Sequence, residues 1–260
     1  MIILQIKKLL TIALIFIVTI IMLPIQIIFF YSNVNLQNYI PRIYHKIILK
    51  ILGIRIKLNG LIDSEPGLLI SNHASWIDIF LLSSITNLSF IAKKDVSNWP
   101  FIGFLAKLQK TIFIDRENPK TIPSTIKEIE KRILNKEKVV LFAEGTSSDG
   151  NRILPFKSSI FMICDLIREK NQKIQPISIA YTRYNGLPID RKNRPLIAWY
   201  GNMDLFNHLM GIIASGSFDV DITFHNIIDI SEKKSRKEIS IECEKIIRSG
   251  FLDSLNRSNN

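Results

Sequence analysis

Cysteine and closely spaced histidine are both scarce in this chain. Its 260 residues include two cysteines, Cys164 and Cys243, which form no metal-type spacing. A chain of this length needs no disulfide framework, so two distant thiols indicate a reducing compartment. The four histidines form no metal-ligand pair either, and are His45, His73, His208 and His225. We therefore predict no metal site and no resident cofactor.

Charged residues are absent from Leu9 to Pro41. The strongly apolar part, Leu9 to Tyr31, is long enough to cross a bilayer, which takes ~20 apolar residues. Pro24 and Gln26 interrupt this run, so a bent helix or a hairpin that dips into the membrane is an alternative to a straight span. A cleaved signal peptide is a third option. The run exceeds a typical ~7–15-residue signal core, and no small-x-small cleavage site follows it.

Acidic residues are outnumbered, since 34 Lys and Arg against 23 Asp and Glu give a formal net charge of +11. Such a charge indicates an anionic partner, which could be nucleic acid, anionic lipid or a phosphorylated substrate. A mean hydropathy of +0.19 favours a membrane. The chain also lacks the aromatic and basic interleaving of a nucleic-acid stacking surface. We expect an anionic membrane as a partner, and no nucleic acid.

Basic residues gather directly behind the apolar run. Arg42, Lys46 and Lys50 recur every four residues, with an apolar stripe on another face of the same predicted helix, residues 42–52. A basic amphipathic helix of this kind is expected among the headgroups of an anionic membrane, although a helix packed on the protein's own core has the same pattern. The basic excess on this side predicts a main domain on the cytoplasmic face of the inner membrane.

Beyond residue 53, short apolar runs alternate with amphipathic runs. The former predict strands at Ile54–Leu58, Leu68–Ile70, Leu88–Ala92, Thr111–Ile114, Val139–Phe142, Ile174–Ala180, Leu196–Tyr200 and Phe218–Phe224. The latter predict helices, clearest at Ser75–Ile85, Ile122–Ile133 and Ser231–Arg248. This alternation predicts an α/β fold with a largely parallel mixed sheet flanked by helices. We divide the chain into a membrane segment with a basic helix (1–52), an α/β domain (53–250) and a polar tail (251–260).

The turn after the predicted strand at Leu68–Ile70 carries the candidate catalytic groups. Open α/β sheets place reactive groups where a strand ends before a helix, and His73 occupies that place. Asp78 follows in the first helical turn, from which its carboxylate can reach back to the imidazole, as a general base requires. Ser75 with an acid three positions later is also typical of a capped helix start. The stretch alone leaves both interpretations open.

Two later strands also end in polar loops. The first loop begins with Asp115 and Arg116, a pair that by itself is typical of a surface ion pair. In the second loop, Gly145 permits close backbone approach to a ligand, and Arg152 and Lys157 can meet an anion. We expect the three loops to meet at one edge of the sheet.

Four ordered motifs resemble those of the glycerolipid acyltransferases. They are Asn72-His73-x-x-x-x-Asp78, Phe113-Ile114-Asp115-Arg116, Phe142-x-Glu144-Gly145-Thr146 and Ile174-Gln175-Pro176-Ile177. The resemblance covers residues 40–200 and is greatest for bacterial 1-acyl-sn-glycerol-3-phosphate acyltransferases. It implies direct transfer of a fatty acyl group from acyl-CoA or acyl carrier protein to the hydroxyl of that lysophospholipid, giving phosphatidic acid. The chain has no Gly-x-Ser-x-Gly elbow, which is consistent with a reaction without an acyl-enzyme.

The resemblance implies a role for each matching residue. His73 would be the general base, and Asp78 would orient its imidazole. The substrate-binding residues that we predict are Asn72, Lys93, Arg116, Glu144, Gly145, Thr146, Arg152 and Lys157. Of these, Lys93, Arg116 and Lys157 match basic positions that hold the acceptor phosphate. The acceptor pocket is shaped by the motif of Glu144 and Gly145, and Pro176 matches the acyl-donor side.

Two departures from the family pattern concern the acceptor. The third motif usually reads Phe-Pro-Glu-Gly-Thr-Arg, but Ala143 and Ser147 replace its Pro and final Arg here. The second motif usually opens with Gly, where this chain has Lys110. Because the missing Arg is a phosphate contact that Arg152 or Lys157 would have to replace, a lyso-aminolipid such as lyso-ornithine lipid is an alternative acceptor. A non-catalytic membrane-binding protein with the same fold is a further alternative. The presence of both His73 and Asp78 argues against it.

Overall fold

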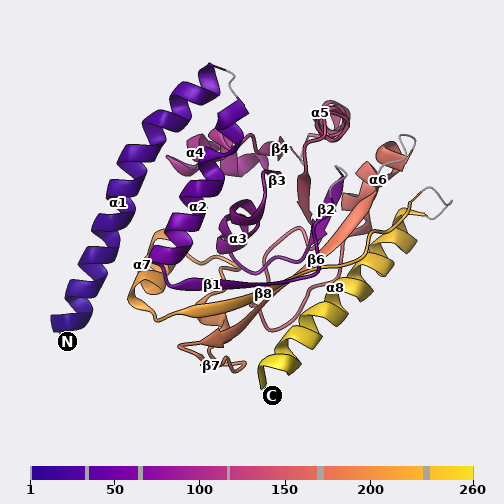
Figure 1. The fold of residues 1–260 in the computed structure, drawn as a ribbon. Helices are drawn as coiled ribbons and strands as arrows, with labels where there is room; N and C mark the ends of the chain where they lie inside the picture. The colour runs from indigo at the N-terminus through magenta and orange to yellow at the C-terminus, as the bar shows by residue number, and fades with distance from the viewer. Residues whose placement is uncertain are drawn as a thin grey trace.

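A mixed sheet forms the centre of the fold, with helices on both of its faces (Figure 1). The computed structural model describes residues 2–32, 35–63, 67–115, 118–168, 173–230 and 235–259. The strands are β1 (Ile54–Asn59), β2 (Leu68–Ser71), β3 (Ser89–Lys93), β4 (Ile112–Ile114), β5 (Val139–Phe142), β6 (Ile174–Tyr184), β7 (Leu187–Pro188) and β8 (Phe218–Phe224). The α-helices are α1 (Ile2–Tyr31), α2 (Ile40–Ile51), α3 (Ile77–Ile85), α4 (Ile102–Leu108), α5 (Ile122–Leu134), α6 (Met162–Arg168), α7 (Leu205–Ala214) and α8 (Arg236–Asn259).

The strand order explains where a site can form. Across the described residues it is β1-β8-β6-β2-β5-β3-β4, and β7 pairs with β6. Strands β6, β2, β5, β3 and β4 run parallel, whereas β8 is antiparallel to β6 and parallel to β1. The predicted α/β fold with a largely parallel mixed sheet is thus confirmed. Because β2, β5, β3 and β4 end at the same edge, the loops that follow them meet there.

Each face of the sheet has its own hydrophobic core. Neighbouring strand residues point to opposite faces, so on β2 Leu68 and Ile70 join one core and Leu69 joins the other. The first core is covered by α5, α6 and α8 and contains both cysteines as free thiols. The second core is covered by α2, α3 and α7. The sheet is therefore shielded on both sides, and its C-terminal edge is left for chemistry.

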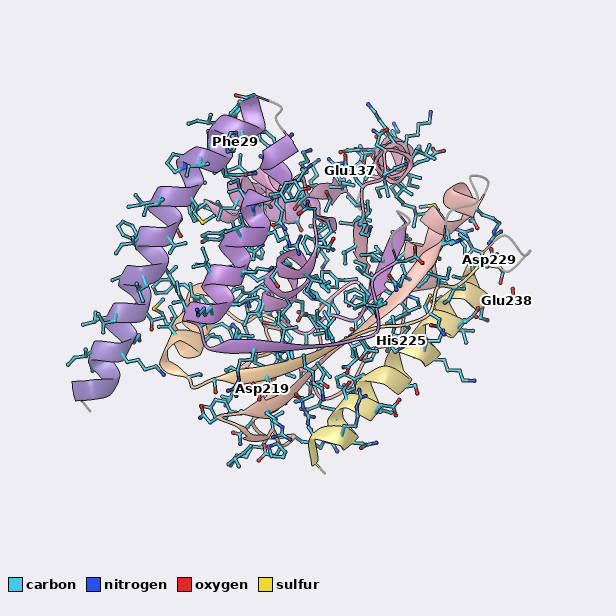
Figure 2. All side chains as sticks on the ribbon, in the orientation of Figure 1. Phe29, Glu137, Asp219, His225, Asp229 and Glu238 are labelled. Atoms are coloured by element: carbon cyan, nitrogen blue, oxygen red, sulfur yellow. The ribbon has the colours of Figure 1, made fainter. Side chains whose placement is uncertain are left out.

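Helix α8 is longer than the sequence predicted. The prediction ended the helix at Arg248 and made residues 251–260 a polar tail, but α8 runs from Arg236 to Asn259, and residues 231–234 lie outside the described part. Phe251, which is 3% exposed, continues the buried stripe into the predicted tail. His225 lies next to α8 (Figure 2). Gly250 allows close packing on it, because a Cβ there would collide with the imidazole. Residues 251–260 were predicted as a tail because most of them are polar, although one face of this helical segment is buried.

The predicted strand at Leu196–Tyr200 is wrong. The chain forms a short 3-10 helix at Arg194–Leu196 and then an irregular segment. Ile197 and Ala198 are fully buried, so the apolar run reflects burial rather than strand pairing. One backbone bond, from Trp199 N to Ala74 O at 2.8 Å, ties this segment to the turn that carries His73.

Helix α1 is continuous from Ile2 to Tyr31, with Pro24 inside it, so a hairpin does not form here. It lies alongside α2 on one flank of the domain (Figure 1). Gln26 is buried, and its Nε2 donates to the carbonyls of Gln37 and Leu108 at 3.1 and 2.9 Å. The polar residue inside the apolar run therefore fastens α1 to the domain. The opposite face of α1 exposes large apolar side chains, among them Leu9, Phe16, Ile17, Ile20 and Ile21.

The apolar stripe of α2 was expected to face the membrane. Instead, Ile48 and Leu49 are buried in the core that α3 also covers. Lys46 and Lys50 remain exposed on the other side of the helix. The core-packing alternative is correct for the C-terminal part of the stripe, including Ile48 and Leu52, which packs on α1 and α3, whereas Ile43 near the start of α2 is exposed.

Candidate active site

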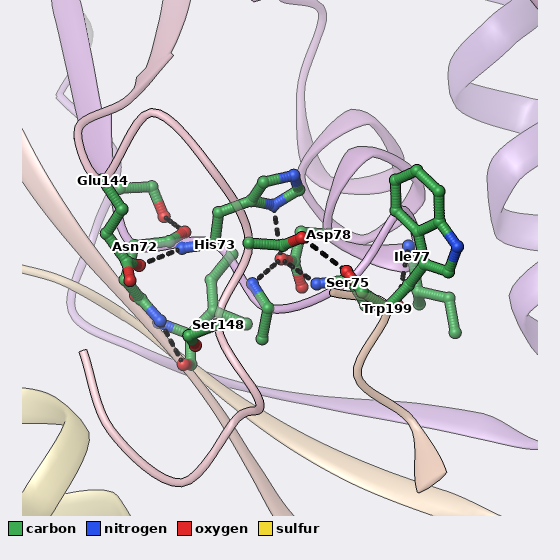
Figure 3. Close-up of polar contacts among 12 residues, drawn as sticks. Asn72, His73, Ser75, Ile77, Asp78, Glu144, Ser148 and Trp199 are labelled. Carbon is green, nitrogen blue, oxygen red and sulfur yellow. Dashed lines mark hydrogen bonds and ion pairs between the residues drawn. The ribbon is translucent and has the colours of Figure 1, made fainter. Parts of the chain in front are cut away.

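The turn between β2 and α3 brings His73 and Asp78 together (Figure 3). His73 Nδ1 lies 2.8 Å from Asp78 Oδ2, and the two side chains are 17% and 0% exposed. A carboxylate can only accept, so Nδ1 is the donor and Nε2 keeps a free lone pair. The solvent-accessible imidazole is therefore held in the tautomer that a general base needs.

Asp78 also closes the turn in front of α3. Its Oδ2 accepts the backbone N–H groups of Ala74 at 2.7 Å and Ser75 at 2.9 Å. The N-cap residue of α3 is Trp76, which makes no side-chain cap bond, rather than the predicted Ser75. Asp78 nevertheless holds the turn and the imidazole through the same oxygen. This bonding fixes the carboxylate next to the imidazole before any substrate binds.

Tyr181 is a member of the site that our sequence interpretation missed. It lies on β6, is 1% exposed, and donates its hydroxyl to Asp78 Oδ1 at 2.6 Å. A tyrosine inside an apolar strand was a usable signal, because a buried phenol needs a hydrogen-bond partner. Which partner it finds depends on the pairing of β6 beside β2, which the local sequence does not specify.

Glu144 holds the backbone of the catalytic turn rather than a side chain. Its Oε1 accepts His73 N at 2.7 Å, and its Oε2 accepts Leu154 N at 2.7 Å. On the other side, Ser148 N donates to His73 O at 2.9 Å (Figure 3). Burial raises the pKa of Glu144 to about 8, although the two backbone donors oppose this rise. The loop after β5 thus clamps the peptide groups on both sides of His73.

Two aromatic rings support the imidazole. The Phe142 ring stacks on His73 with centroids 3.9 Å apart and an interplanar angle of 16°. Phe90 stacks in turn on Phe142 at 5.9 Å. Phe142 is the last residue of β5 and Phe90 is the second residue of β3, so the sheet register sets the plane of the catalytic ring.

Of the predicted substrate-binding residues, Asn72 is buried in the fold, whereas Thr146 is exposed. Asn72 is 2% exposed, and its amide exchanges bonds with Ile179, from Ile179 N to Oδ1 at 2.8 Å and from Nδ2 to Ile179 O at 3.0 Å. This arrangement favours a structural link between β2 and β6. Gly145 has a φ of 70°, a left-handed conformation that favours glycine. Thr146 next to it is exposed.

The implied phosphate contacts lie at the surface or outside the described residues. Lys93, at the end of β3, is exposed, and so are Arg152 and Lys157 in the segment after β5. Arg116 lies outside the described part of the chain. Ser147, which replaces the usual Arg, donates its hydroxyl to the carbonyl of Trp199. Within the described ranges, the structure contains no group of three or more His, Cys, Asp or Glu side chains that could hold a metal ion.

Comparison with known proteins decides the family. The sequence model described as Acyltransferase matches residues 33–180, which is more than half of the chain. The chain belongs to the glycerolipid acyltransferase family. The protein is accordingly an acyltransferase, as the four motifs implied.

Several glycerolipid acyltransferases are similar over most of their length. The lyso-ornithine lipid O-acyltransferase of Rhizobium meliloti (strain 1021) is 37% identical and covers 92% of this chain and 83% of the relative. Its counterpart from Brucella abortus (strain 2308) is 38% identical, covering 90% of each. The 1-acyl-sn-glycerol-3-phosphate acyltransferase of Neisseria gonorrhoeae is 27% identical over 72% of this chain and 69% of its own.

One solved glycerolipid acyltransferase confirms the fold. The crystal structure of the 1-acyl-sn-glycerophosphate (LPA) acyltransferase PlsC from Thermotoga maritima matches with a TM-score of 0.67. The match covers 96% of this chain and 97% of that one, at 17% sequence identity. The N-terminal helix and the α/β domain thus form one architecture shared with a known member of the family.

Proposed function

We propose that this protein transfers a fatty acyl group from an acyl thioester to the free hydroxyl of a lyso-ornithine lipid. The main support for this acceptor is the sequence identity to two lyso-ornithine lipid O-acyltransferases, which is 37% and 38% over 92% and 90% of the chain. Ser147 supports it, because an ornithine headgroup carries no phosphate that would require the usual Arg. The motifs had favoured 1-acyl-sn-glycerol 3-phosphate, whose acyltransferase from Neisseria gonorrhoeae is 27% identical. That lysophospholipid remains the second candidate acceptor.

The geometry around His73 supports a direct transfer. Nε2 accepts the hydroxyl proton while the alcohol oxygen attacks the thioester carbonyl carbon. Asp78, hydrogen-bonded to Nδ1, stabilises the imidazolium that forms. The tetrahedral intermediate then loses its C–S bond, and His73 returns the proton to the departing thiolate. General-base catalysis of this kind contributes roughly 10²- to 10⁴-fold to a rate.

Substrate binding is assigned to the loops at the same sheet edge. Gly145 and Thr146 would line the acceptor site, and the exposed cations Lys93, Arg152 and Lys157 would attract anionic groups. Both acyl-CoA and acyl carrier protein are anionic, which suits a chain with a net charge of +11.

Membrane association follows from α1. The residues Gln5–Tyr31 form a 27-residue apolar helix, which is long enough to cross a membrane. Its packing along the domain and its exposed apolar outer face support insertion of that face into lipid. We propose that the enzyme works at the cytoplasmic face of the inner membrane, where its lipid acceptor is located.

The test is an acyl-transfer assay with the purified full chain in lipid vesicles. Lyso-ornithine lipid and lysophosphatidic acid are supplied in parallel, each with acyl-CoA or acyl carrier protein as donor. We expect faster acylation of lyso-ornithine lipid, and a loss of roughly 10²-fold or more in kcat for His73→Ala. His225→Gln, which changes a histidine packed under α8, should keep the wild-type rate. Preference for lysophosphatidic acid would overturn the acceptor, and full activity of His73→Ala would overturn the mechanism.

A further inference from the structure

Tyr181 reaches from β6 to the carboxylate that orients His73. Its hydroxyl donates to Asp78 Oδ1 at 2.6 Å. The other oxygen of Asp78 already accepts His73 Nδ1 and two backbone N–H groups. Within the described residues, the hydrogen bond at Asp78 Oδ1 is the one that the Tyr181 hydroxyl donates. The carboxylate therefore has donors on both oxygens.

We propose that Tyr181 is a positioning residue for acyl transfer, which fixes the rotation of the Asp78 carboxylate and sets how strongly that carboxylate attracts the imidazole proton. The proposal rests on the proposed general-base role of His73. Tyr181 touches Asp78 rather than the reacting atoms, so its effect is transmitted through the Asp78–His73 hydrogen bond.

The rotation argument starts from the freedom of a carboxylate. The terminal torsion of Asp is broad and roughly two-fold, so donors on one oxygen leave the other free to swing. Tyr181 removes this freedom, because its ring is buried in the same core as the side chains of α3. Oδ2 is then held on the line to His73 Nδ1.

The charge argument concerns how negative Oδ2 is. A donor on Oδ1 draws electron density from the carboxylate and weakens its attraction for the proton on Nδ1. Burial, with the neighbouring Asp78 charge and the hydrogen bond, raises the pKa of Tyr181 well above 10, so the phenol keeps its proton and remains a donor. Without this donor, Asp78 Oδ2 is more negative and attracts the proton on His73 Nδ1 more strongly.

The experiment compares Tyr181→Phe with a matched change on the same strand. Tyr184→Phe removes a hydroxyl from a ring that packs on Phe218 at 4.9 Å, away from Asp78. For Tyr181→Phe we expect kcat to fall roughly 10- to 100-fold, the range for one hydrogen bond to a charged group. KM values for donor and acceptor should stay at wild-type level, and the acidic limb of the pH–rate profile should move to higher pH. Tyr184→Phe should change neither.

Two further measurements distinguish positioning from packing. In an Asp78→Asn background, adding Tyr181→Phe should change kcat by less than about 2-fold, because both changes act on one interaction. Independent, multiplicative effects would overturn the proposal, as would wild-type kcat and an unmoved pH profile in the single variant. The NMR resonance of the His73 Nδ1 proton should move in Tyr181→Phe relative to wild type, because its hydrogen bond to Asp78 changes, and an identical resonance would overturn the proposal. This last comparison holds even if neither lysolipid is acylated, an outcome that would reject the proposed function alone.

Discussion

Glu144 holds His73 through the backbone, with Oε1 2.7 Å from the His73 peptide nitrogen and Oε2 2.7 Å from that of Leu154. Both carboxyl oxygens are therefore acceptors for N–H groups. The motif that was expected to shape the acceptor pocket is also the clamp that fixes the catalytic turn.

Glu144→Gln tests this clamp. The amide has one acceptor oxygen, so one of the two backbone N–H groups would face an NH₂ group. We expect the free energy of unfolding to fall by about 1–3 kcal/mol and the acyl-transfer rate to fall because the His73 turn shifts. Urea unfolding and the transfer assay measure the two effects. Glu137→Gln changes a glutamate at the surface and should leave both unchanged, whereas a neutral Glu144→Gln would reject the clamp.

The same carboxyl group predicts a pH dependence of stability. Burial raises the pKa of Glu144 to about 8, from an ordinary value of 4.5. The folded state thus keeps a proton that the unfolded chain loses near pH 4.5, so this contribution is fully present below that pH and is lost as the pH rises through 8. Wild type should lose more free energy of unfolding than Glu144→Gln between about pH 5 and pH 9. Parallel pH curves for the two proteins would contradict this prediction.

Asn72→Leu separates a structural link from a substrate contact. The apolar side chain leaves the N–H and C=O of Ile179 buried without the Asn72 amide. We expect a loss of about 2–3 kcal/mol in the free energy of unfolding, with KM for the acceptor unchanged. Asn202→Leu, at an exposed position, serves as the control. A raised KM with unchanged stability would restore the substrate-binding role.

Ser147→Arg tests why the acceptor differs from the family pattern. The guanidinium would stand where the third motif usually has Arg, so a phosphate acceptor gains a charge-assisted contact. We expect the ratio of kcat/KM for lysophosphatidic acid over lyso-ornithine lipid to rise about 10-fold or more. Ser147→Ala removes only the hydroxyl bonded to Trp199 and should leave this ratio unchanged. An unchanged ratio in Ser147→Arg would mean that other residues select the headgroup.

The outer face of α1 predicts how the protein binds lipid. Ile17 and Ile21 are exposed on one face of this helix. Replacing both by Glu should reduce the affinity for anionic phospholipid vesicles, measured by co-sedimentation, about 10-fold or more. Two apolar side chains that would insert into the lipid are lost and two negative charges are added. The melting temperature in detergent should not change. Gln26→Leu should do the reverse, lowering stability through loss of its two bonds while vesicle binding persists.

The sequence predicted an element correctly where the spacing of its apolar residues matched the burial that the fold gives it. Apolar runs such as Val139–Phe142 became buried strands. The spacing of His73 and Asp78 allowed the contact that the structure shows, although the stretch alone was equally typical of a capped helix start. The segment Leu196–Tyr200 was misread because burial in an irregular segment and burial in a strand give the same apolar pattern. Tyr181 and Phe142 were missed as parts of the site because their contacts depend on sheet register, which no local pattern encodes.

The pairing of β1 with β8 has a consequence for the way the protein is made. Arg55 and its partner Asp219 are 164 residues apart in the chain. During synthesis α1 emerges before β1 and is free to engage a membrane, whereas β1 cannot pair until β8 has been made. Such long-range pairing slows folding. A ribosome stalled before residue 218 would leave β1 without its partner and β6 with an open edge, which is the kind of surface that aggregates.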